Sequence, residues 1–254
     1  MKSARVLFAL AMIWLGVLGF AKGDFAQIWQ PVPKWMPARE LLAYLCAFVS
    51  LSSGIGLLVE RTATRAARAI FASLVIWLLA FRLPNLFYEK PLVLVAWTFG
   101  STAVMAAAAW ILSGVAGSTG VRVARALYGV SLIPFGLAHF MYLDATTVLI
   151  PHWLPWPAAW AYLTGATFIA AGLAAIFNVY ARLAVTLSTL QLVLFSVIVW
   201  VPLAVTSPLN DFQRGEFVST WVLTAGAWVV AASYLGVPWL SARHTRALAA
   251  DDGR

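Results

Sequence analysis

Two ionisable side chains near the ends of long apolar runs are the strongest candidates for chemistry in this 254-residue chain. His139 offers an imidazole, which can carry protons at neutral pH, ligate a metal or hydrogen-bond a quinone carbonyl. Arg82 offers a permanent charge, which needs compensation wherever lipid replaces water. Carboxylates near the ends of neighbouring apolar runs can supply it: Asp24, Glu89, Asp211 and Glu216.

These groups allow a functional and a structural interpretation. In the functional one, Arg82, His139 and a carboxylate such as Asp24 or Glu216 surround a small-molecule pocket at the outer side of a membrane. In the structural one, His139 bonds a neighbouring carbonyl, while Arg82 forms an ion bridge or extends its charge to the lipid headgroups. Residue types alone leave both interpretations open.

Two proline-rich segments, 31–37 and 151–157, contain Trp35 and Trp153. Proline disfavours regular helix and tryptophan prefers the headgroup region, so we expect both segments to lie along the outer membrane surface. They serve either as aromatic anchors or as lids over a cavity, in which case Trp35 and Trp153 join the ligand-binding residues.

The sequence contains no recognisable catalytic or metal-binding motif. Cys46 is the one cysteine, which excludes both a disulfide within the chain and a Cys-x-x-Cys redox pair. There is no glycine-rich nucleotide loop, and near His139 the additional metal ligands are limited to His152 and Asp144. We therefore predict no catalytic residue, no metal and no evident cofactor, although a quinone is compatible with the sequence.

Composition indicates a membrane protein. Hydrophobic residues make up 63% of the chain, and 17 Lys and Arg with 9 Asp and Glu leave charge far below the roughly 25% of a soluble domain. A globule of this size cannot hide so much apolar surface from water. The net charge of +8 does not indicate nucleic-acid binding, because the basic residues lie between apolar runs.

The apolar runs predict eight transmembrane helices, each long enough to cross about 30 Å of hydrocarbon. A secretory signal over residues 1–23 is the alternative for the first run. The predicted spans lie near 5–21, 41–59, 66–83, 91–113, 122–142, 158–178, 182–204 and 217–240.

The basic residues predict the orientation, because Lys and Arg accumulate in short cytoplasmic loops. With the N-terminus inside, eleven Lys and Arg residues face the cytoplasm and six face outward. We therefore expect a multi-pass protein of the bacterial plasma membrane with both termini in the cytoplasm.

An internal repeat accounts for the number of helices. Residues 99–110 and 217–228 share seven identities in twelve at an offset of 118, and Gly54 and Pro84 match Gly172 and Pro202 at that offset. We predict two tandem, parallel four-helix repeats, residues 1–118 and 119–240, followed by a cytoplasmic tail, 241–254. The first run has a copy in the second half, which favours a retained helix over a cleaved signal.

The second half resembles the DoxX-like family of bacterial membrane proteins. The resemblance lies in Phe135-Gly-Leu-Ala-His-Phe140, Ile150-Pro-His-Trp-Leu-Pro155, Trp160-Ala-Tyr-Leu-Thr-Gly165 and Gly172. It implies a four-helix unit with a Gly-x-x-His-Phe first helix, and the first half looks like a divergent copy with Gly19 in place of His139. Some relatives look like membrane partners of oxidoreductases that use quinones or sulfur compounds.

Three functions follow as hypotheses. The first, which we favour, is a small-ligand-binding protein or an accessory partner of a membrane or periplasmic redox protein. The second is a small-solute transporter, although few ionisable residues lie at midmembrane. The third is a membrane-embedded enzyme acting on a lipid-soluble substrate, which requires an acid and a base within hydrogen-bond reach.

Overall fold

The computed structural model describes residues 1–206 and 208–241, and every regular element in these residues is a helix. The predicted tail, 241–254, lies outside the described residues except for Ser241. The elements are α1 (Lys2–Lys22), η1 (Gln27–Trp29), α2 (Arg39–Leu58), α3 (Glu60–Trp77), η2 (Leu78–Arg82), α4 (Leu83–Tyr88), α5 (Leu92–Ser113), α6 (Gly117–Met141), α7 (Leu143–Thr147), α8 (Pro157–Phe177), α9 (Ala181–Leu194), η3 (Phe195–Trp200), α10 (Val201–Thr206) and α11 (Asp211–Ala232).

Eight helical spans in the described residues are long and apolar enough to cross a membrane, which confirms the predicted all-α membrane architecture. Six of them are single helices: α1, α2, α5, α6, α8 and α11. The third span runs through α3, η2 and α4, and the seventh through α9, η3 and α10. Both η2 and η3 are π-helical turns, a feature often found at functional sites.

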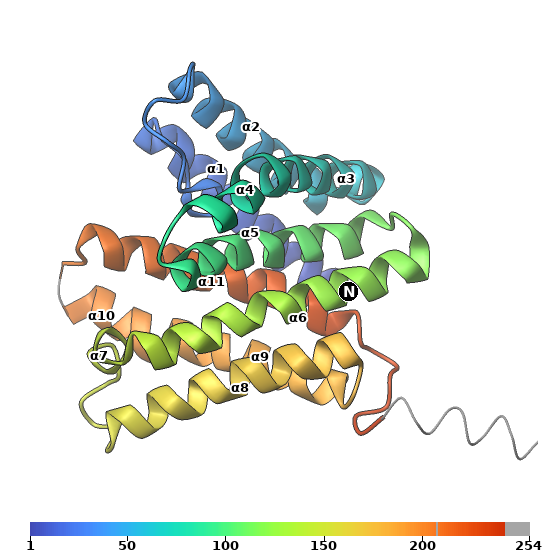
Figure 1. Ribbon diagram of the computed structural model, residues 1–254. Helices are drawn as coiled ribbons and strands as arrows, with labels where there is room; N and C mark the ends of the chain where they lie inside the picture. The colour runs from blue at the N-terminus through green and yellow to red at the C-terminus, as the bar shows by residue number, and fades with distance from the viewer. Residues whose placement is uncertain (207, 242–254) are drawn as a thin grey trace, which may run out of the picture.

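The spans lie side by side, with their connections at two ends of the molecule (Figure 1). The N-terminus and the turns that join α2 to α3, α5 to α6 and α8 to α9 lie at one end, here called the N-terminal end. The loops that join α1 to α2 and α6 to α8 lie at the opposite, distal end. Helix α1 packs along α2 and α6 along α8, while α5 and α11 contact each other between these pairs.

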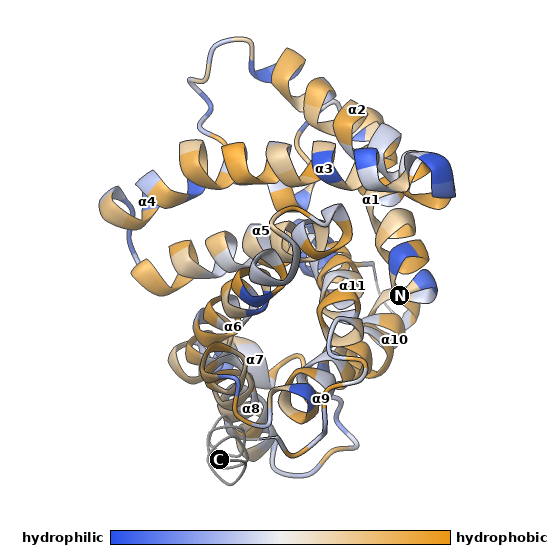
Figure 2. Ribbon diagram, turned by 90° about the vertical axis from the view of Figure 1, so that its right-hand side faces the viewer, coloured by the Kyte–Doolittle hydropathy of each residue, from blue (hydrophilic) through white to orange (hydrophobic). Residues whose placement is uncertain are grey.

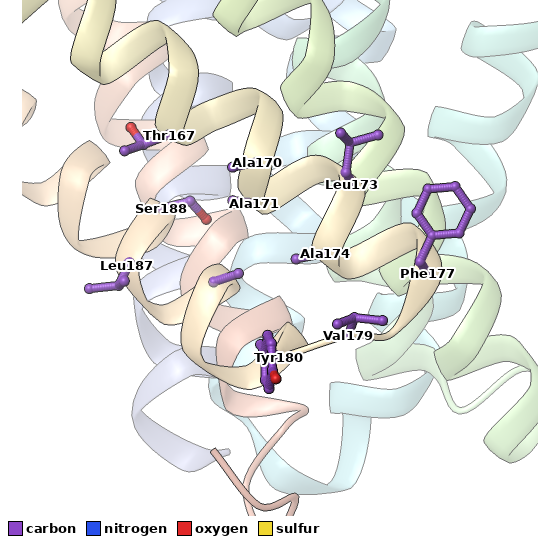
Figure 3. A pocket seen from close by; sticks show the side chains of 11 residues that line it. Thr167, Ala170, Ala171, Leu173, Ala174, Phe177, Val179, Tyr180, Leu187 and Ser188 are labelled. Carbon is purple, nitrogen blue, oxygen red and sulfur yellow. The ribbon is translucent and has the colours of Figure 1, made fainter. Parts of the chain in front are cut away.

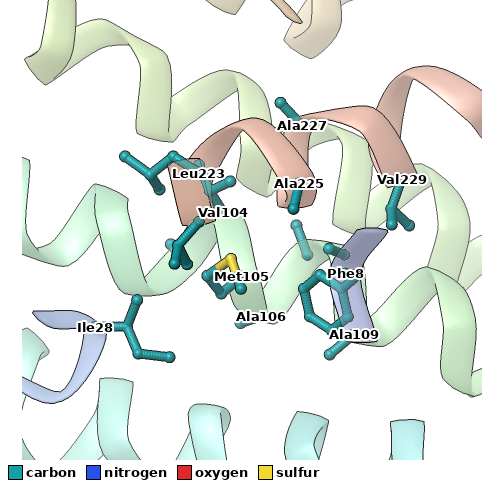
Figure 4. Packing of buried hydrophobic residues seen from close by; sticks show 14 of the residues in the cluster. Phe8, Ile28, Val104, Met105, Ala106, Ala109, Leu223, Ala225, Ala227 and Val229 are labelled. Atoms are coloured by element: carbon teal, nitrogen blue, oxygen red, sulfur yellow. The ribbon is translucent and has the colours of Figure 1, made fainter. Parts of the chain in front are cut away.

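Small side chains allow α5 and α11 to occupy the centre of the bundle. The run from Ala103 to Ala109 in α5 is almost fully buried. Gly226 of α11 lies against this run, because a Cβ atom there would be 3.0 Å from Sδ of Met105, and Ala225 and Val229 lie on the same side of α11 (Figure 4). Phe8 of α1 fills the space beside them. Close approach of helix backbones through small residues is a general packing mode for membrane helices.

Glycines bring the paired helices into backbone contact. A Cβ atom at Gly136 of α6 would lie 2.4 Å from the carbonyl oxygen of Gly165 in α8. A Cβ atom at Gly16 of α1 would likewise lie 2.8 Å from the carbonyl oxygen of Ala47 in α2. Both distances are far below van der Waals contact, so these positions require glycine for packing.

The last span differs in position from the predicted 217–240. Helix α11 begins at Asp211 because Asn210 and Gln213 form a reciprocal capping box. It ends at Ala232.

The chain after α11 packs against the bundle through Tyr234, whose ring centroid lies 3.7 Å from the Arg125 guanidinium. Burial raises the pKa of Tyr234 to about 12, so its phenol is neutral at physiological pH.

Candidate ligand site around His139

His139 lies in the last turn of α6, at the distal end of the bundle. Its Nδ1 atom is 2.8 Å from the carbonyl oxygen of Phe135, one helical turn earlier. A carbonyl accepts but cannot donate, so Nδ1 carries the proton in this contact. This is the neighbouring-carbonyl bond that the structural interpretation of the sequence predicted.

Aromatic rings from two other helices surround the imidazole. The Phe168 ring of α8 lies 5.6 Å from it, and the Phe195 ring, at the start of η3, stacks on it at 6.0 Å with an angle of 21° between the planes. Gly165 permits this arrangement, because a Cβ atom there would lie 2.9 Å from Cβ of His139. The imidazole is therefore held in one orientation by packing and by the Phe135 carbonyl.

The Nε2 atom of His139 has no hydrogen-bond partner in the described part of the chain. With the proton on Nδ1, a neutral imidazole presents a lone pair at Nε2 and accepts a hydrogen bond. This arrangement suits a ligand that carries a hydroxyl group. A quinone carbonyl, which the sequence also suggested, needs the protonated imidazole as donor.

Arg82 is bound to the chain itself. It is 1% exposed, and its Nε atom donates to Oγ1 of Thr102 at 3.1 Å. Its terminal nitrogens donate to the carbonyl oxygens of Ile28 and Pro31, each at 3.1 Å, and also to that of Gln30. No carboxylate within the described ranges forms an ion pair with Arg82, so carbonyl dipoles and one hydroxyl compensate its charge.

The carbonyls that bind Arg82 belong to residues 24–32, here called the inserted segment, which enters the first half of the bundle from the distal end. Five of its apolar side chains are buried, those of Phe25, Ala26, Ile28, Trp29 and Val32, with Trp29 only 1% exposed. Nε1 of Trp29 donates to Oγ of Ser50 at 3.1 Å, and Nε1 of Trp77 donates to the Trp29 carbonyl at 3.1 Å. Polar contacts therefore attach the segment to α2 and to α3.

The other predicted site residues lie apart from these contacts. Asp24 pairs with Arg39 at 2.8 Å. Glu216 is half-buried on α11, and its carboxylate forms no hydrogen bond or ion pair with the residues that the structure describes. Trp35 and Trp153 are 78% and 69% exposed in the two distal loops, outside regular helix.

The structure gives His139 and Arg82 separate environments, one in each half of the chain. The inserted segment and the ring partners Phe168 and Phe195 were not anticipated from the sequence. One sequence signal was available for Phe195, since the offset of 118 relates it to Trp77, which contacts the inserted segment. Among the described residues, no group of three or more His, Cys, Asp or Glu side chains is placed to hold a metal.

The chain matches no family model, and no curated protein or solved structure is detectably similar to it. Hydrophobic residues predominate along the spans (Figure 2), and many large ones are exposed, among them Leu41, Phe48 and Leu79. Exposed apolar faces on eight spans imply contact with lipid hydrocarbon. Fold and surface together define a polytopic, all-helical membrane protein.

Proposed function

We propose that this chain is a bacterial plasma-membrane protein of DoxX-like type that binds a lipid-soluble molecule bearing a hydroxyl group, such as a quinol, at His139. The observation that carries the proposal is the oriented imidazole of His139, whose Nε2 atom has no hydrogen-bond partner among the residues that the structure describes. Such a protein can act as an accessory partner that holds a reduced quinone for a membrane or periplasmic oxidoreductase.

The tandem, parallel repeat, residues 1–118 and 119–240, is part of this proposal. Its support is the matched packing of Gly16 on Ala47 and of Gly136 on Gly165, together with the π-helical turns in the third and seventh spans. In the first half the inserted segment occupies the distal side of the bundle. In the second half, the connection from α6 to α8 contains α7, which has no buried residue. We infer that the second half retained the ligand site.

Binding of a decyl-substituted benzoquinol tests this function. We expect the purified protein in detergent to bind the quinol, with quenching of tryptophan fluorescence, and His139→Phe to bind about tenfold more weakly, because one hydrogen bond is lost. Phenylalanine keeps a ring between Phe168 and Phe195. His152→Phe is the matched control, since His152 lies exposed in the loop before α8. Equal affinity of wild type and His139→Phe, or no binding by wild type, would refute the proposal.

The orientation has a direct test by cysteine labelling in a Cys46→Ala background. We expect Lys34→Cys and His152→Cys in intact cells to react with a membrane-impermeant maleimide, because they lie in the distal loops. Arg65→Cys, near the N-terminal end of the bundle, should react only after the membrane is opened. The reverse pattern would place both termini outside.

A further inference from the structure

An open cavity of about 560 Å³ lies between α8 and α9, on the side of the bundle nearer the N-terminal end (Figure 3). Its volume falls within the range of small-molecule sites. Its floor consists of small residues, and larger side chains stand at its rim (Figure 3). The lining residues are Thr167, Ala170, Ala171, Leu173, Ala174, Phe177, Val179, Tyr180, Ala184, Leu187 and Ser188.

The hydroxyls of the exposed Thr167 and the buried Ser188, which both line this groove, are already used by the protein. Thr167 donates to the Thr164 carbonyl at 2.9 Å and contacts Gln191, while Ser188 donates to the Val185 carbonyl at 3.0 Å and bonds the hydroxyl of Tyr128. The groove therefore offers no free polar group to an occupant in its deep part. Its lining selects a hydrocarbon chain.

At the corresponding place in the first half, α2 and α3 are in close contact. A Cβ atom at Gly56 of α2 would lie 2.8 Å from Cβ of Ala66 in α3, so these helices are in close contact. At the offset of 118, these residues correspond to Ala174 and Ala184, which line opposite walls of the groove. The close contact at this pair in the first half therefore contrasts with the open groove between Ala174 and Ala184 in the second half.

The positive charge near the groove indicates which kind of lipid would place its hydrocarbon chain there. The groove extends to the turn that joins α8 to α9, and Arg182 follows that turn, with its guanidinium 3.9 Å from the Trp239 ring centroid and donating to the Val237 carbonyl. Among the described residues at the N-terminal end, basic side chains outnumber acidic ones, and Glu60 is the one acidic residue there. The basic residues are Lys2, Arg5, Arg61, Arg65, Arg68, Arg122, Arg125 and Arg182. Such an end attracts anionic headgroups.

We propose that the groove between α8 and α9 is a lipid site that holds one acyl chain of an anionic phospholipid, with its phosphate beside Arg182. The site is distinct from His139, and this inference does not depend on quinol binding. Because the groove is closed toward the centre of the bundle and open toward the lipid, an acyl chain can enter it laterally from the bilayer.

Native mass spectrometry of the delipidated protein with phosphatidylglycerol, and with phosphatidylcholine of the same acyl chains, tests the site. We expect wild type to retain one phosphatidylglycerol in preference to phosphatidylcholine. Ala174→Trp fills the groove and should weaken that first binding event about tenfold, which corresponds to the lost contacts of about two methylenes. Ala72→Trp is the matched control, because Ala72 is exposed on α3 away from the groove.

Arg182→Gln separates the two parts of the proposal. We expect it to abolish the preference for phosphatidylglycerol while one lipid of either kind still binds. His139→Phe should leave lipid retention unchanged, and thermal unfolding would verify that every variant is folded. Retention by Ala174→Trp equal to that of Ala72→Trp, or equal binding of both lipids by wild type, would overturn the proposal.

Discussion

Replacement of Arg82 by alanine is expected to release the inserted segment, residues 24–32, from the first half of the bundle. The substitution removes every donor that Arg82 supplies to the carbonyls of Ile28, Gln30 and Pro31. Thr102 still donates to the Ile28 carbonyl at 2.8 Å. The carbonyls of Gln30 and Pro31 therefore lose their side-chain donor. A loss of about 2–4 kcal/mol in the free energy of unfolding follows from about 1–2 kcal/mol for each.

The position of the segment can be measured with Ile28→Cys, because Ile28 is 2% exposed. In a Cys46→Ala background, we expect Cys at position 28 to be unreactive toward a water-soluble maleimide when Arg82 is present and reactive in Arg82→Ala. Arg214→Ala is the control, since Arg214 pairs with Asp211 on an exposed helix turn and contributes little. Unchanged labelling and stability in Arg82→Ala would show that carbonyl bonding to Arg82 does not hold the segment.

Gly136→Ala is expected to destabilise the protein by about 3 kcal/mol, at the upper end of the range for overpacking. The added methyl group meets the Gly165 carbonyl oxygen and the Ile169 side chain, and a backbone atom cannot rotate away. Helices α6 and α8 must therefore separate. Equilibrium unfolding in mixed detergent micelles measures this loss.

The same chemical change at Gly215 provides the control. A Cβ atom there lies 3.5 Å from Nε2 of Gln27, an ordinary contact, so Gly215→Ala should be neutral or stabilising by up to about 1 kcal/mol. Gly16→Ala should resemble Gly136→Ala if the two halves are packed alike. Similar stabilities for Gly136→Ala and Gly215→Ala would contradict the close contact of α6 with α8.

The sequence predicted the helical architecture well, because lipid requires long apolar runs and these are visible in hydropathy alone. The predicted ends of two spans were wrong, because polar residues there belong to the same helix as the neighbouring apolar run. The predicted third span ends near residue 83, at a short hydrophilic break formed by Arg82, Pro84, Asn85, Glu89 and Lys90. The span instead continues through η2 into α4, where Pro84 occupies the start of a helix that tolerates it. The start of α11 was missed because its cap residues, Asn210 and Gln213, precede the apolar run.

The candidate site was only partly predictable. His139 and Arg82 stood out as polar residues in apolar surroundings, and both are buried or half-buried in the structure. Their separate environments depend on the inserted segment, whose aromatic and apolar residues resemble any interfacial loop. Phe168 carries no distinguishing signal among 15 phenylalanines, and Phe195 carries only its repeat relation to Trp77, since ring contacts depend on helix rotation rather than on composition.

The nitrogen resonances of His139 test the central claim most directly. The chain has three histidines, so ¹⁵N-histidine labelling with His139→Phe as the assignment variant yields a simple spectrum. Near about pH 8, where imidazoles are neutral, we predict a proton on Nδ1 and an unprotonated Nε2 whose resonance moves when the decyl benzoquinol is added. A proton on Nε2, or an Nε2 resonance that is unaffected by saturating quinol, would contradict the account.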